Sequence, residues 1–118
     1  MALGLGLVTL GGILFVITGW LAWLQKLPPN PVVGIRTRYT LASGDNWYAT
    51  HHAAGPMLIF GGVAATMVGL AFLPFALAGK LPNGLSLSAV IAIAILLLFT
   101  AVASWLYGTR AAKAAAAR

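Results

Sequence analysis

Three long segments of this sequence contain no Asp, Glu, Lys, Arg or His, and this feature restricts the folds open to the chain. They cover residues 2–24, 55–78 and 85–107. Each is long enough to cross the hydrocarbon of a bilayer, about 30 Å thick, as a helix of about 20 residues. A lone strand would leave its backbone groups unpaired in lipid, so we expect all three segments to be helices.

The composition favours a membrane protein over a water-soluble one. Hydrophobic residues make up 61% of the chain and charged residues 7%, whereas soluble domains have about 45–50% and about 25%. A chain of 118 residues cannot bury that much apolar surface in a soluble core. We therefore predict one all-α integral membrane domain over residues 1–118, with three transmembrane helices.

The first segment is interpreted as a retained helix rather than a cleaved signal peptide. No basic residue precedes its apolar run, and the run is longer than the core of a signal peptide. The residues that follow, Gln25 to Pro28, do not form a small-residue cleavage site.

The basic residues predict the orientation. Lys26, Arg36 and Arg38 lie between the first two spans and three more basic residues follow the third, while Lys80 alone falls on the other side. By the positive-inside rule, we expect a multi-pass protein of the cytoplasmic membrane with its N-terminus outside and its C-terminus in the cytoplasm. Arg38 is interpreted as an ordinary orientation residue.

The basic tail, residues 108–118, is rich in alanine and is expected to extend the third helix. Its cations Arg110, Lys113 and Arg118 suit the anionic lipid headgroups of the cytoplasmic leaflet. Binding of a partner by the tail is the alternative. Since the basic residues flank apolar spans, the net charge of +6 indicates lipid contact rather than direct nucleic-acid binding.

A stripe of small residues predicts close helix packing. Gly61, Ala65 and Gly69 recur at four-residue spacing on the second span. Small side chains let two helix backbones approach closely in lipid. We expect this face to pack on the first or third helix or on a second subunit.

Polar residues gather in the connector, residues 28–52, between the first two spans. It contains both histidines and the only acidic residue, Asp45. Its prolines make its beginning stiff and extended. From Ser43 a helical period returns, with Asp45 in the first turn. This predicts a short interfacial helix from Gly44 to about Ala53, leading into the second span.

Arg36 stands out in the connector because a chain with one carboxylate offers it few protein partners. One reading is structural: Arg36 pairs with Asp45 or binds helix-terminal carbonyls and ties the connector down. The other is functional: Arg36 contacts a lipid phosphate or an anionic group of a partner.

Metal binding and catalysis are not expected. His51 and His52 are adjacent, so on a helix they point about 100° apart, and no further nitrogen or thiolate ligand accompanies them. We expect them to bond to backbone or water. Paired carboxylates, a glycine-rich phosphate loop and any Asp, Glu, Lys, Arg or His within a span are all missing. The chain is therefore predicted to be no enzyme and to need no cofactor.

The connector resembles the SdpI family of bacterial membrane proteins. The resemblance rests on the following residues, in chain order: Asn30, Gly34, Ile35, Arg36, Thr37, Thr40, Ser43, Trp47, His51 and Gly55. It implies that the motif residues of this chain are Asn30, Gly34, Arg36, Thr37, Thr40, Trp47 and His51. The best-known member has six spans, gives immunity to a secreted peptide toxin and holds a cytoplasmic repressor at the membrane. This chain resembles the three-span core module alone.

The resemblance implies a role in immunity or signal transduction. The chain would protect against a membrane-active peptide, or sense it, through the connector, with a peptide toxin or a cytoplasmic regulator as partner. Two other hypotheses stay open. The chain could be an accessory, non-catalytic subunit of a larger membrane complex, or a protein that binds lipid or a small amphiphile.

Overall fold

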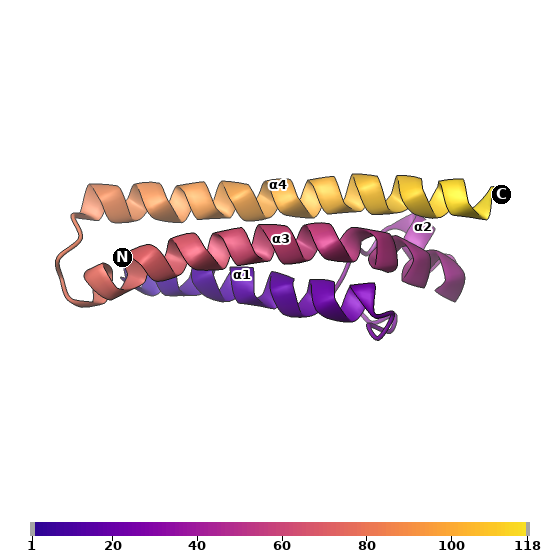
Figure 1. Cartoon of the computed structure of the whole chain (residues 1–118), viewed down its shortest axis with the longest axis horizontal. Coiled ribbons are helices and arrows are strands. Elements are labelled where there is room, and N and C mark those ends of the chain that lie inside the picture. Colours follow the sequence, from indigo (N-terminus) through magenta and orange to yellow (C-terminus); the bar gives the residue numbers. More distant parts are fainter. Residues whose placement is uncertain (1, 118) are drawn as a thin grey trace.

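The computed structural model describes residues 2–117, and their regular structure is entirely helical. The elements are α1 (Ala2–Trp23), α2 (Arg38–Leu41), α3 (Gly44–Leu77) and α4 (Asn83–Ala116). The three long helices lie along a rod of 55 × 20 × 19 Å, with α3 antiparallel to both α1 and α4 (Figure 1). Each is long and apolar enough to cross a membrane, so the predicted all-α fold with three transmembrane helices is confirmed.

The short helix predicted between the first two spans is present, but at other residues. It is α2, a single turn at Arg38–Leu41. The segment predicted for it, Gly44 to Ala53, is also helical, yet it continues without a break into α3. Hydropathy marks where a chain enters lipid and not where a helix begins, which explains the difference.

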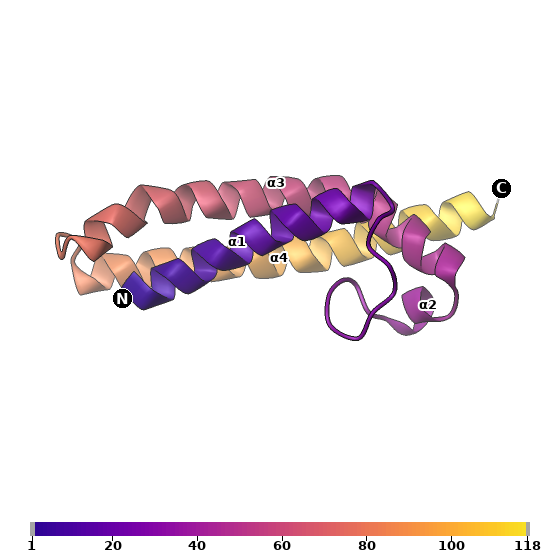
Figure 2. The same cartoon turned by 90° about the horizontal axis from the view of Figure 1, so that it is seen from below.

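Both α3 and α4 are longer than a bilayer requires. Each has 34 residues, about 51 Å at 1.5 Å per residue, against about 30 Å of hydrocarbon. A Cβ on Gly108 of α4 would lie 2.7 Å from the carbonyl oxygen of Thr50 on α3. The first turns of α3 and the last turns of α4 therefore run side by side beyond the predicted spans, at the end that carries the connector (Figure 2).

The tightest packing lies between α1 and α3, where glycines of the two helices face each other. A Cβ on Gly62 would lie 2.6 Å from the carbonyl oxygen of Gly12. Seven residues later on α1 and seven residues earlier on α3, a Cβ on Gly55 would lie 2.7 Å from the carbonyl oxygen of Gly19. At both places the backbones touch, so no larger residue fits without moving a helix. We call these two contacts the glycine seam.

The predicted stripe Gly61, Ala65 and Gly69 faces the interior of the bundle. Gly61 lies against Thr100 of α4, and Gly69 lies against Thr9 of α1. Ala65, between them, is fully buried in a cluster with Leu5, Ala89 and Ile93. The stripe thus serves both neighbouring helices, because α3 packs on α1 and on α4 while those two contact each other far less.

The end of α1 turns the chain back toward α3. Gln25 adopts a positive φ of 58°. The Lys26 amide donates to the carbonyl oxygen of Leu21 at 2.8 Å, and the Gln25 amide donates to that of Ala22 at 3.1 Å. These two bonds satisfy carbonyls that a helix end leaves free, and they direct the connector along the first turns of α3.

The glycine seam predicts the effect of adding one methyl group. Gly62→Ala should lower the free energy of unfolding by about 1–3 kcal/mol, because its methyl meets backbone atoms that cannot rotate away. The measurement is unfolding of the purified protein in mixed micelles, followed by circular dichroism. The matched control is Gly6→Ala on α1, where a Cβ meets nothing within 4 Å. If both variants lose the same stability, the seam is not the critical contact.

Candidate functional site

Trp47 fastens the start of the connector to α3. Its side chain is fully buried beside Ala22 and Leu27. The indole Nε1–H donates a hydrogen bond of 2.8 Å to the carbonyl oxygen of Leu27, twenty residues earlier. The chain leaving α1 is therefore held against the first turns of α3, with its buried carbonyl satisfied.

His51 fastens the middle of the connector one turn further along α3. Its Nε2 accepts a hydrogen bond of 2.8 Å from the backbone N–H of Ile35. Its Nδ1 lies 2.7 Å from the carbonyl oxygen of Trp47. Because an amide can only donate and a carbonyl can only accept, the geometry requires the neutral imidazole with its proton on Nδ1. The ring also stacks on the indole of Trp47, with ring centroids 4.2 Å apart.

Burial of His51 lowers the pKa of its imidazole below the usual value of 6.5, although its hydrogen bond to the Trp47 carbonyl acts in the opposite direction. The residue lies in the turns of α3 that precede the predicted span, residues 55–78. Protonation would place a second N–H against the Ile35 amide, so the same contact that positions the connector disfavours the charged ring.

Gly34 provides the space that these two rings need. Its φ is 118°, which side chains rarely tolerate. A Cβ here would lie 2.7 Å from His51 Nε2 and 3.1 Å from the Trp47 ring. Glycine is therefore required both by the backbone conformation and by the approach of the connector to the ring pair.

Asn30 organises the exposed loop before Gly34. Its Oδ1 accepts hydrogen bonds from the amides of Val32 and Val33, at 2.9 and 2.7 Å. Its Nδ2 donates to the carbonyl oxygens of Pro28 and Val33, at 2.9 and 3.0 Å. One side chain thus supplies hydrogen-bond partners to backbone groups that have no helix or strand neighbour in this loop.

Thr37 and Thr40 build α2 through a reciprocal cap. Thr37 Oγ1 accepts from the Thr40 amide at 3.2 Å, and Thr40 Oγ1 accepts from the Thr37 amide at 2.9 Å. The buried Thr40 hydroxyl also donates to the carbonyl oxygen of Ile35 at 2.7 Å. Asn46 of α3 donates to the carbonyl oxygen of Tyr39 at 2.9 Å and so holds α2 in place.

Of the seven predicted motif residues, six hold the connector in place: Asn30, Gly34, Thr37, Thr40, Trp47 and His51. The seventh, Arg36, is exposed, as is Asp45 in the first turn of α3. Their proposed ion pair stays a prediction. Hydrogen bonds between neutral groups hold the connector, and Arg36 is directed to its surface.

The contributions of Asn46 and of the backbone groups of Leu27 and Ile35, described above, were not predicted. His52, which was expected to bond to backbone or water, is exposed, and its Nδ1–H donates to the carbonyl oxygen of Trp23, at the end of α1, at 2.7 Å. With both nitrogens of His51 bonded to backbone, that ring offers no free lone pair to a metal ion.

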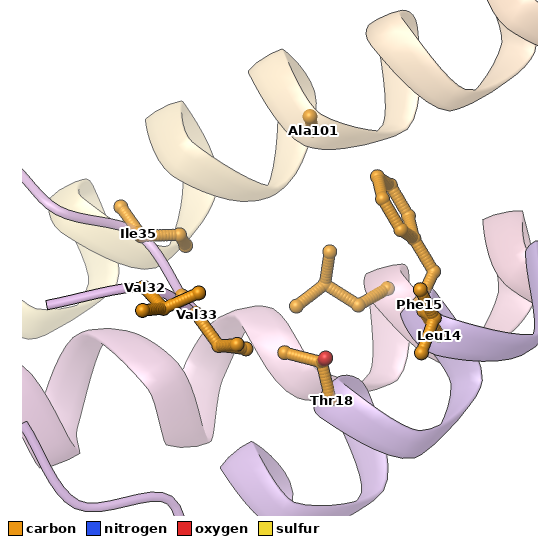
Figure 3. Close-up of a pocket in the computed structure, with 9 residues that line it drawn as sticks. Leu14, Phe15, Thr18, Val32, Val33, Ile35 and Ala101 are labelled. Carbon is orange, nitrogen blue, oxygen red and sulfur yellow. The ribbon is translucent and has the colours of Figure 1, made fainter. Parts of the chain in front are cut away.

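Beside the connector, an apolar groove of about 310 Å³ opens between α1 and α4. In Figure 3 the side chains of Leu14, Phe15 and Thr18 on α1 face those of the connector across it. The connector side is formed by residues 32–35, and Ala101 of α4 lies above. The groove exists because α1 and α4 contact each other little and the connector covers only one end of the gap between them.

The basic tail continues α4 as a helix to Ala116, as predicted. Arg110 and Lys113 are exposed on it, while Arg118 lies outside the described residues. Lys113 Nζ lies 5.1 Å from the centroid of the Tyr39 ring. This cation–π contact joins the tail to α2. The proposed contact of the tail with anionic lipid headgroups stays a prediction.

Comparison with known proteins identifies a relationship over most of the chain. The family model described as the SdpI/YfhL protein family matches residues 26–109. No curated protein matches the chain, and no solved structure matches it. The matched residues begin just before the connector and end within α4, so they include every motif residue predicted above.

The structure predicts that Gly34→Ala loosens the connector. The variant should cost about 1–3 kcal/mol of local stability, because the new methyl meets His51 and the φ becomes strained. Hydrogen exchange at the Ile35 amide is the measurement, and we expect faster exchange. Gly44→Ala is the control, since a Cβ there meets nothing within 4 Å. Equal exchange in the two variants would contradict the role given to Gly34.

The lowered pKa of His51 predicts a loss of stability in acid. The unfolded chain takes up the proton near pH 6.5, about the ordinary value, whereas the folded protein takes it up only at lower pH. The free energy of unfolding should therefore be constant above that pH and decrease as the pH falls toward the lowered pKa. Unfolding measured across this range tests it, with His51→Gln as reference: the variant should lack this step. Identical pH profiles would refute the assignment.

Proposed function

The chain belongs to the SdpI/YfhL family of proteins, and from this premise we propose that it is a small, non-catalytic membrane protein that protects a bacterial cell against a membrane-active peptide or senses it. The connector is the contact surface in this proposal. The relevant partner is a peptide toxin, and a cytoplasmic regulator would act with it if the protein signals.

One observation carries the proposal. Six motif residues are used to hold the connector rigidly on α3, and the remaining one, Arg36, is exposed on its surface. A guanidinium that projects from a fixed backbone can bind a carboxylate or a peptide C-terminus with little loss of conformational entropy. Such preorganisation is expected of a recognition surface, whereas a structural arginine would be buried against its partners.

The apolar groove adds a second contact for the same ligand. It begins at Val32 to Ile35, directly before Arg36. Val32 itself is 81% exposed. A membrane-active peptide carries apolar residues next to polar ones, so its apolar residues would occupy the groove while Arg36 meets an anionic group. The same groove supports the alternative of binding a lipid or another small amphiphile.

If the chain is instead an accessory subunit of a larger complex, purification should give a different result from that expected of an independent protein. Gentle detergent extraction from the native membrane would then recover other subunits in a fixed ratio. Recovery of the chain alone, or as a homo-oligomer, supports independent action.

Arg36→Ala should abolish protection. The chain is expressed in a bacterial host that a panel of membrane-active peptides inhibits, and the inhibitory concentration is measured for each peptide. We expect the parent protein to raise this concentration for at least one peptide and Arg36→Ala to return it to that of the host without the protein, because the anionic group of the peptide loses its partner.

Lys26→Ala is the control, since Lys26 is also an exposed basic residue on the same side of the membrane in the predicted orientation. It should protect like the parent. If Arg36→Ala protects equally well at the same abundance in the membrane, the connector is not the contact surface.

A further inference from the structure

We propose that a hollow between α2 and α4 is a binding site for the phosphate group of an anionic membrane lipid. The hollow has a volume of about 360 Å³. Arg38 of α2 lines it together with Arg110 and Lys113 of α4. Two elements far apart in the sequence thus bring three cations to one place, which makes it a defined site rather than a diffuse positive surface.

Within residues 2–117, no acidic side chain lines this hollow. The chain has one acidic side chain, and this residue, Asp45, lines a different hollow with Tyr48 and His52. Three cations near one another repel unless an anion joins them. Two of the three are arginines, whose planar guanidinium groups match the oxygen geometry of a phosphate. A phosphate in the hollow would relieve the repulsion and satisfy these donors.

Thr37 of the connector and Thr109 of α4 also line the hollow. Lys113 is already oriented by its contact with the Tyr39 ring at 5.1 Å, which keeps the tail and α2 together around the hollow.

The order of residues along α4 favours a lipid over free phosphate. Trp105 and Leu106 line one end of the hollow, and both belong to the last turn of the predicted span, residues 85–107. Arg110 and Lys113 follow one and two turns later, beyond that span. A phosphate held by the cations would therefore sit at headgroup level, with its acyl chains running along Leu106 and Trp105 into the bilayer.

Native mass spectrometry of the full chain in a neutral detergent tests this site. The protein is offered equal amounts of phosphatidylglycerol and phosphatidylcholine. We expect one phosphatidylglycerol to bind in preference. The double variant Arg38→Gln, Arg110→Gln should reduce the preference for phosphatidylglycerol over phosphatidylcholine about tenfold or more. The matched control, Lys26→Gln with Lys80→Gln, removes the same charge outside the hollow and should keep the preference.

The other outcomes count against the proposal. An equal loss in the control variant would show diffuse attraction rather than a site. Displacement of phosphatidylglycerol by an equal concentration of inorganic phosphate would show a site for the free anion. Lys113→Gln, at an exposed position near the end of α4, is a second variant that leaves both arginines of the hollow in place. It should also reduce the preference while circular dichroism shows unchanged helix content, and an unchanged preference would overturn the assignment.

Discussion

The contact of two helix backbones along the glycine seam is the constraint on which the rest of the molecule depends. Because Gly12 and Gly19 touch Gly62 and Gly55 directly, α1 and α3 are fixed in register as well as in distance. That register brings the end of α1 to the level of His52, which bonds to Trp23. The first residues of the connector then reach Trp47 and His51, so the position of the connector follows from packing inside the lipid-facing part of the bundle.

The connector is held by neutral groups, and this has an electrostatic consequence. Trp47, His51 and Thr40 bond to backbone atoms, and neither arginine of the connector takes part in these bonds. In a chain with a single carboxylate, those cations remain for other tasks. Arg36 is exposed and directly follows the connector residues that line the apolar groove, and Arg38 lines the hollow beside the basic tail. The two arginines of the connector, two residues apart, therefore serve separate surfaces in our proposals.

The spans and the motif residues could be predicted, whereas their contacts could not. Long apolar segments can only be helices in lipid, so the three-helix fold follows from the number and length of these segments. The stripe at Gly61, Ala65 and Gly69 was found by its four-residue spacing, but the seam repeats every seven residues, as expected where antiparallel helices pack at a small angle. The seven-residue spacing of Gly12 and Gly19 on α1, and of Gly55 and Gly62 on α3, is the sequence pattern that corresponds to this seam.

Other features depend on backbone atoms and cannot be inferred from side-chain identity. Nothing in the sequence marks the Leu27 carbonyl or the Ile35 amide as partners, because every residue has such groups. His51 was predicted to bond either to backbone or to water. Which of these two partners it has depends on where the connector folds back, and this could not be predicted from the sequence. Similarly, Arg38 resembled an ordinary orientation residue until α2 placed it beside α4.

The arrangement also bears on how the protein is made. The glycine seam and the bonds that fix the connector all involve residues that precede α4. Once α1, the connector and α3 have been synthesised, all residues that form the helical hairpin and hold its connector are therefore present. α4 is synthesised afterwards. It forms the side of the apolar groove opposite α1 and places its basic last turns beside α2. Folding can thus proceed in two stages, and the groove and the hollow that α4 lines form only after α4 has been added.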